Sequence, residues 1–159
     1  MKLYHGTNVD FQAIDLRRCK PNKDFGRGFY LTDIIGQARD MAVRKCDIEG
    51  KGMIIVQRYN FDEQNLTNGE LSVLRFATVC EEWAEFILKN RMQKRPRFQH
   101  TYDVVIGPIA DDGVVLQLNR YAQGMIDLTT LVRELTYRKL NNQYFFGTDK
   151  GISMLRREC

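Results

Sequence analysis

The chain has 159 residues, of which 43% are hydrophobic and 28% are charged. This length and balance are typical of one globular domain with a core of its own, and they exclude an intrinsically disordered chain. The formal net charge of +4 is compatible with an anionic ligand or partner, but it is too small to indicate nucleic-acid binding by itself.

The sequence carries no pattern typical of a metal site or a disulfide framework. The cysteines are scattered without a Cys-x-x-Cys pair, at Cys19, Cys46, Cys80 and Cys159. With only His5 and His100 as histidines, we expect no zinc, and we interpret the cysteines as reduced thiols of an intracellular protein. MKLYHGT lacks a signal-peptide core, and no apolar run approaches the ~20 residues of a membrane span. We therefore expect a cytoplasmic protein that does not enter a membrane.

The first half of the chain predicts short strands and one helix. Strands are predicted at 2–4, 28–32 and 53–59, whereas 71–76 is compatible with a strand or a helix start. A helix is predicted over Ile34–Cys46, with Thr32 or Asp33 as its N-cap. The apolar face of this helix would comprise Ile35, Ala38, Met41 and Ala42.

The second half of the chain predicts several helices with strands between them. Helices are predicted at 81–91, 114–123, 128–140 and 148–156, and strands at 102–106 and 143–146. Asp127 and Thr148 are the expected caps of the last two helices, and Asp112-Gly113 predicts a turn. We expect Trp83, Phe86 and Ile87 in the core. Because no repeat or linker interrupts the pattern, we expect one mixed domain over residues 1–159.

The stretch DFGRGFYLTD, from Asp24 to Asp33, combines a glycine turn with an aromatic pair. A phosphate-binding loop is disfavoured, since a third glycine is missing and the strand follows the glycines. One remaining interpretation is a structural turn before a core strand. The other is a ligand pocket, in which the glycines let a flat ring approach and Tyr30 stacks on it. LYHGT, at 3–7, adds a histidine at the end of a strand.

LYHGT and GRGFYLTD together resemble the diphtheria-toxin-like, His-Tyr-Glu branch of the ADP-ribosyltransferase superfamily, and a bacterial family of unknown function within it. The resemblance implies an α+β fold with a split, antiparallel β core and flanking helices. It implies an enzyme that uses NAD as its substrate and needs no metal. Its acceptor would be a protein, a nucleic acid or a small molecule. Bacterial relatives of this size are often toxins or effectors, so an antitoxin or immunity protein is a further partner to expect.

The resemblance also assigns roles to residues of the two motifs. His5 would hydrogen-bond a ribose hydroxyl of NAD, and Thr7 would assist nearby. Gly6 would hold the nicotinamide carboxamide through its backbone N–H and C=O. Tyr30 would stack on the nicotinamide ring.

Three further residues complete the expected NAD site. Gly28 would let its strand approach the cofactor, and Met41 stands where the branch often places a second aromatic residue as a lid. A methionine packs on a ring but makes a poorer lid. Arg27 either contacts the pyrophosphate of NAD or is solvated.

The third motif departs from the branch, because Gln143 stands where the family has a glutamate. A glutamine keeps a carbonyl oxygen for the ribose 2′-OH but has no charge and cannot act as a general base. Mono-ADP-ribosylation or NAD hydrolysis therefore fits better than polymer synthesis. Asp111 or Asp112 would supply the missing carboxylate at the pocket mouth, or else both belong to an ordinary turn.

Two alternatives and one accessory feature remain. The alternative to a transferase is an inactive module, in which Gln143 marks a site that still binds NAD or ADP-ribose, or no ligand. An RNA 2′-phosphotransferase would need an arginine-rich site, which is not evident around His5 and Tyr30. The basic stretch Lys94–Arg97 is either a contact for a nucleic-acid acceptor or a solvated loop.

Overall fold

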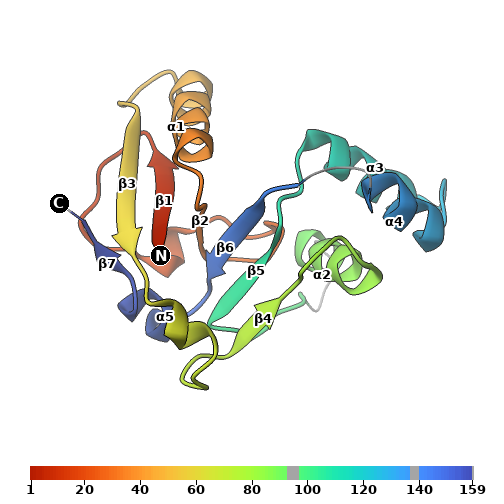
Figure 1. Ribbon diagram of the computed structural model, residues 1–159. Helices are drawn as coiled ribbons and strands as arrows, with labels where there is room; N and C mark the ends of the chain where they lie inside the picture. Colours follow the sequence, from red (N-terminus) through yellow and green to blue (C-terminus); the bar gives the residue numbers. More distant parts are fainter. Residues whose placement is uncertain (93–96, 137–139, 159) are drawn as a thin grey trace.

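The computed structural model describes residues 1–92, 97–136 and 140–158 (Figure 1). The strands are β1 Lys2–Thr7, β2 Phe29–Leu31, β3 Ile55–Asn60, β4 Val73–Arg75, β5 Val104–Pro108, β6 Asn142–Phe146 and β7 Arg156–Arg157. The α-helices are α1 Ile35–Glu49, α2 Glu81–Arg91, α3 Asp112–Ala122, α4 Leu128–Thr136 and α5 Asp149–Ser153. Short 3₁₀ turns lie at Leu16–Arg18 and Glu63–Leu66. The class is therefore mixed α+β, as predicted.

The strands form two small sheets. One has the order β1-β3-β7 and the other the order β2-β6-β5-β4, and only the β4–β5 pair is parallel. Figure 1 shows α1 beside the first sheet, whereas α2, α3 and α4 lie at the far side of the second. None of the described helices combines the length and the apolar composition needed to cross a membrane.

The two sheets are joined where β1 meets β2. The Tyr4 N–H donates to the Thr32 carbonyl at 2.7 Å, and the Thr32 N–H donates back at 3.0 Å. This pair is an isolated bridge, so β1 and β2 part immediately beyond it. The β core is thus split between these two strands.

Side chains of β6 alternate between two hydrophobic clusters on opposite faces of the second sheet. Phe145 packs with Trp83 of α2 and the apolar residues of α3 and α4. Tyr144 and Phe146 pack with Leu3 of β1 on the other face. Successive residues of a strand point to opposite faces, so this short strand contributes to both halves of the core.

The predicted positions of the elements are largely confirmed, but the start of α1 is not. The N-cap residue of α1 is Ile34, which makes no side-chain cap, while the Thr32 hydroxyl accepts from the Ile34 N–H two residues later. The predicted apolar face of α1 is confirmed for two of its four residues and wrong for the other two. Ala38 and Ala42 are buried, but Ile35 and Met41 are 45% and 46% exposed, because α1 covers the sheet with small residues alone.

The caps of the late helices are confirmed, while some of their boundaries are wrong. Asp127 accepts from the Thr130 N–H, and Thr148 accepts from the Gly151 N–H. Asp112 belongs to the first turn of α3 rather than to a separate turn, since Asp111 caps that helix. The last helix ends at Ser153 and gives way to β7.

Three predicted features fall partly or wholly outside the described residues. The predicted helix at 128–140 includes 137–139, and the basic stretch at 94–97 is described only at Arg97. Cys159 also lies outside the described part of the chain.

Candidate functional site

His5 lies where β1 and β2 part, and its ring bridges the two strands. Its Nδ1 lies 2.7 Å from the Tyr30 carbonyl oxygen. A carbonyl only accepts, so Nδ1 carries the proton and Nε2 is left as an acceptor. Burial and the nearby Lys45 charge lower the pKa of His5 to about 4. The imidazole is therefore neutral near neutral pH.

The backbone of Gly6 faces the gap between the strands. Alternate residues of an antiparallel strand point their N–H and C=O to the same side, and those of Tyr4 point to β2. A Cβ on Gly6 would lie 1.8 Å from the Ala38 carbonyl oxygen, so α1 packs directly on this glycine. Only glycine allows that approach.

Lys45 of α1 reaches into the same gap. Its Nζ donates to the Gly6 carbonyl at 2.7 Å and lies 3.5 Å from His5 Nε2. Burial lowers the pKa of Lys45, and the charges of Lys23 and Lys20 lower it further. The ammonium thus bonds to the carbonyl that, by the resemblance, would hold a nicotinamide carboxamide.

The gap is surrounded by cations. Lys23 acts electrostatically on both His5 and Lys45. Burial raises the pKa of the Cys19 thiol, and the charges of Arg27, Lys45 and Lys23 oppose that increase. Such a group of positive side chains suits an anionic ligand.

Tyr30 is held rigidly at both ends of its side chain. Its hydroxyl donates to the Gly26 carbonyl at 2.7 Å and accepts from the Phe25 N–H at 3.0 Å. The ring packs edge-to-face on Phe145 with centroids 5.2 Å apart. Burial raises the pKa of Tyr30 well above its ordinary value. The ring is therefore neutral and fixed in orientation.

Gln143 contacts a carboxylate that the sequence motifs do not assign to the site. Gln143 Nε2 donates to Asp24 Oδ2 at 3.1 Å, and Arg91 Nε pairs with Asp24 Oδ1 at 2.8 Å. Asp24 is only 8% exposed. The one sequence signal for Asp24 is its position at the start of DFGRGFYLTD, two residues before the glycine turn.

The structure places Tyr30 and Gln143 on one face of the second sheet. Tyr30 is paired with Phe145, and Gln143 lies two residues before Phe145 on the same strand. Residues two apart share a face. The Asp24-Phe25 segment crosses this face, with Phe25 N–H on the Tyr30 hydroxyl and Asp24 on Gln143. His5 joins the group through the Tyr30 carbonyl.

Three other predicted site residues, Gly28, Thr7 and Arg27, make local contacts of different kinds. A Cβ on Gly28 would lie 2.2 Å from the Phe145 ring, so this glycine serves packing within the sheet. The Thr7 hydroxyl donates to the Val9 carbonyl at 3.0 Å, in its own loop. Arg27 is exposed and donates to the Arg17 carbonyl at 3.2 Å.

Asp111 and Asp112 lie at the start of α3. The Asp111 carboxylate accepts from the Val114 N–H at 2.8 Å. Asp112 Oδ2 lies 3.4 Å from Arg44 Nη2, which links α3 to α1. The carboxylate that contacts Gln143 is that of Asp24, and Met41 lies exposed on α1.

Among the described residues, no group of three or more His, Cys, Asp or Glu side chains could hold a metal ion. Cys19, Cys46 and Cys80 are free thiols. The candidate site therefore consists of backbone amide groups, a neutral imidazole, an aromatic ring and a basic surround. These are groups that bind an uncharged amide, a flat ring and phosphate.

Fold and site together define an α+β protein with a candidate ligand site at a split in its β core. The chain belongs to the family described as Protein of unknown function (DUF3990), which matches residues 1–157. No curated protein and no solved structure matches the chain. The family description assigns no activity, so any function has to be argued from the residues of the site.

Proposed function

We propose that the protein is an NAD-dependent mono-ADP-ribosyltransferase with an ADP-ribosyltransferase-like fold. The observation that carries this proposal is the convergence of His5, Gly6 and Tyr30 where β1 and β2 part. His5 Nδ1 lies 2.7 Å from the Tyr30 carbonyl, and Gly6 directs its backbone into the gap. Residues 25 positions apart in sequence are thereby joined into one site.

The groups in the gap suit the nicotinamide riboside half of NAD. A primary carboxamide both donates and accepts, so it complements the N–H and C=O of Gly6. Tyr30, whose carbonyl is bonded to His5, offers a fixed aromatic ring. His5 Nε2, an acceptor on a neutral ring, suits a ribose hydroxyl. The cations Lys20, Lys23 and Arg27 suit the pyrophosphate.

The reaction breaks the bond between ribose C1′ and the nicotinamide nitrogen. Nicotinamide leaves as a neutral molecule with the bonding electron pair, and positive charge develops at C1′. An acceptor nucleophile forms the new bond to C1′ and releases its proton. The active site has to fix both partners and stabilise that charge.

In this proposal, Gln143 and Asp24 together replace the glutamate of the His-Tyr-Glu branch of the ADP-ribosyltransferases. The Gln143 amide donates through Nε2 to Asp24, which leaves Oε1 to accept from the ribose 2′-OH. Asp24 brings a negative charge, but its pairing with Arg91 offsets much of it. We therefore expect turnover to be slow, since enzymes commonly gain most of their rate enhancement from electrostatic stabilisation of the transition state.

One observation favours a second candidate function, an NAD- or ADP-ribose-binding module. Lys45 Nζ donates a hydrogen bond to the Gly6 carbonyl at 2.7 Å, so the nicotinamide carboxamide has to displace the ammonium to bind there. Together with the missing glutamate, this contact would give a site that holds the ligand without transferring it.

The two functions are separated by following NAD with a radiolabel in the ADP-ribose half. The protein is incubated with labelled NAD and a bacterial lysate, and both free nicotinamide and labelled macromolecules are measured. We expect transfer that Tyr30→Ala and Gln143→Ala abolish. Gln64→Ala, an exposed residue of the 3₁₀ turn Glu63–Leu66, is the matched control and should retain transfer.

Other outcomes of this experiment are equally informative. Nicotinamide release without transferred label would indicate a glycohydrolase. Binding of NAD without release of nicotinamide would favour the binding module and contradict the transferase. Melting curves of both active-site variants are required, because Tyr30 packs against the core.

A further inference from the structure

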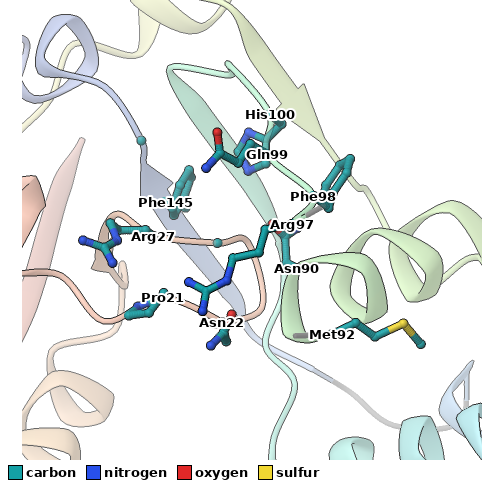
Figure 2. A pocket seen from close by; sticks show the side chains of 12 residues that line it. Pro21, Asn22, Arg27, Asn90, Met92, Arg97, Phe98, Gln99, His100 and Phe145 are labelled. Carbon is teal, nitrogen blue, oxygen red and sulfur yellow. The ribbon is translucent and has the colours of Figure 1, made fainter. Parts of the chain in front are cut away.

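A cavity lies beside the Gly26 turn. It has a volume of about 280 Å³ and lies between the loop at 21–27, the end of α2, the segment at 97–100 and the end of β6 (Figure 2). None of the residues that would bind nicotinamide or ribose lines it. Arg27 alone is shared with the basic surround of the first site.

Two arginines enter this cavity from different elements. Figure 2 shows Arg27 from the glycine turn and Arg97 from the segment that follows α2. Both are exposed, and neither pairs with a carboxylate within the part of the chain that the structure describes. Guanidinium groups without a carboxylate partner suit phosphate, which they bind with two parallel hydrogen bonds. Arg27 would exchange its hydrogen bond to the Arg17 carbonyl for such a contact.

Aromatic rings form another wall of the cavity. Phe98 is 40% exposed, and its ring centroid lies 6.2 Å from that of His100. His100 in turn lies 5.5 Å from Phe145, edge-to-face. An exposed phenylalanine beside arginines offers a face on which a nucleobase stacks, as in proteins that bind single-stranded nucleic acid.

His100 of the cavity wall carries an unsatisfied acceptor. His100 Nε2 lies 2.8 Å from the Phe25 carbonyl, so Nε2 carries the proton and Nδ1 is an acceptor. His100 Nδ1 is the one buried side-chain nitrogen or oxygen of the described residues that lacks a hydrogen-bond partner. This buried atom is not exposed in the cavity, so His100 lines the wall with its ring and not with this acceptor.

The floor of the cavity is rigid. Gly26 has φ +89°, and a Cβ there would lie 2.9 Å from Asn90 Oδ1. Asn90 is itself fixed, since its amide donates to the Phe86 carbonyl at 2.9 Å. The glycine turn is thus packed closely against α2.

We propose that this cavity binds one nucleotide, with the base against Phe98 and the phosphate on Arg27 and Arg97. The volume of about 280 Å³ lies just below the ~300–1,000 Å³ of common ligand pockets, so this cavity has room for one nucleotide at most. We infer further that the nucleotide is the end of a single-stranded nucleic acid, which would be the acceptor. That second step rests on the proposed transferase function, whereas the nucleotide site does not.

The test is binding of nucleotides to the full chain without NAD. Fluorescence anisotropy with a 5′-phosphorylated, fluorescently labelled RNA octamer measures the dissociation constant, and AMP and CMP are used as competitors. We expect Phe98→Ala and Arg97→Gln each to weaken binding about tenfold. Arg97 is exposed and Phe98 is 40% exposed, so neither is a core residue and both variants should fold. Arg120→Gln, an exposed arginine of α3, is the control and should bind like the wild type.

The competitors identify the source of the nucleotide. An octamer that binds more tightly than AMP and CMP supports a nucleic-acid end. Equal affinities support the nucleotide site with a free nucleotide as its ligand. Undetectable binding of all three, or binding that Phe98→Ala leaves unchanged, would overturn the proposal.

An NAD titration of Phe98→Ala separates the two sites. Unchanged NAD affinity is expected. A parallel loss of NAD and octamer binding would show that the cavity holds the adenosine half of NAD, and the acceptor assignment would fail. Octamer binding without any ADP-ribose transfer would leave the nucleotide site standing and refute only the transferase.

Discussion

The two candidate sites differ in how their polar groups are satisfied. In the gap between β1 and β2, His5 is bonded to Tyr30 and Lys45 to Gly6, and on the adjoining face of the second sheet Gln143 is bonded to Asp24. In the cavity beside Gly26, two arginines have no described carboxylate partner and His100 Nδ1 has no partner among the described residues. The first site is preorganised, but a ligand has to replace the hydrogen bond between Lys45 and Gly6. In the second site, the arginines can bind an anion without breaking an ion pair among the described residues.

Gly6→Ala should have the largest effect, because it removes the close approach on which the gap depends. The new Cβ would lie 1.8 Å from the Ala38 carbonyl oxygen. Backbone cannot yield as a flexible side chain does, so we expect a loss of about 3 kcal/mol or more in the free energy of unfolding. Urea denaturation measures it.

Gly36→Ala, on the helix α1 that packs against Gly6, is the matched control. No atom lies within 4 Å of a Cβ there, and alanine is favoured over glycine in a helix by about 1 kcal/mol. A Gly6→Ala protein as stable as Gly36→Ala would contradict the described packing of α1 on β1.

The buried imidazole of His5 predicts a loss of stability in acid. Its pKa is about 4 in the folded chain, against an ordinary value of 6.5. Protonation therefore favours the unfolded chain: stability is full above pH 6.5 and is lost as the pH falls toward 4. The full effect is about 3 kcal/mol. Unfolding curves of the wild type and His5→Gln should converge as the pH falls; parallel curves would show that His5 is not buried in its neutral form.

Asp24→Asn should weaken both fold and activity. The variant keeps the shape but removes the charge that pairs with Arg91 and accepts from Gln143. We expect a loss of about 2 kcal/mol in unfolding free energy, since Arg91 remains partly in water, and a fall of about tenfold in NAD turnover. Asp15→Asn, whose partner Arg17 is exposed, is the control. Unchanged turnover in Asp24→Asn would exclude Asp24 from the mechanism.

Lys45→Met should shift ligand affinities by several-fold and in opposite directions. The variant frees the Gly6 carbonyl, so nicotinamide alone should bind more tightly. It also removes a cation from the gap, so ADP-ribose should bind more weakly. Calorimetric titrations of both ligands measure the two shifts. Shifts of the same sign would mean that Lys45 does not compete with the carboxamide.

Arg44→Gln should have the smallest effect on stability. The pair of Arg44 and Asp112 has side-chain exposures of 61% and 89%. Exposed ion pairs contribute at most about 1 kcal/mol, so thermal denaturation of this variant should resemble that of the wild type. A large destabilisation would show that the link between α1 and α3 is structural.

The sequence predicted the elements better than the contacts among them. Helix α2 matches its predicted range, 81–91, because Trp83, Phe86 and Ile87 recur at helical spacing and are all buried. Met41 was expected on an apolar face but is exposed, since α1 needs small residues where it crosses Gly6. That requirement comes from packing between segments far apart in sequence, which periodicity does not report.

The candidate site was predictable only where its residues fall in local motifs, because sequence patterns do not report contacts between distant segments. His5, Gly6 and Tyr30 fall in short recognisable stretches, and the structure brings them together at one strand end. Asp24 begins the DFGRGFYLTD stretch without a role assigned to it, and Lys45 belongs to no such stretch. Their importance follows from contacts across 119 and 39 residues of chain, with Gln143 and Gly6 respectively, and only the folded chain reveals them.

The central claim is that the gap between β1 and β2 binds NAD, and calorimetric titration with NAD tests it most directly. We predict saturable binding by the wild type, its loss in folded Tyr30→Ala, and its retention in Arg97→Gln. Wild-type protein that binds no NAD, or Tyr30→Ala that binds it as well as the wild type, would contradict this claim.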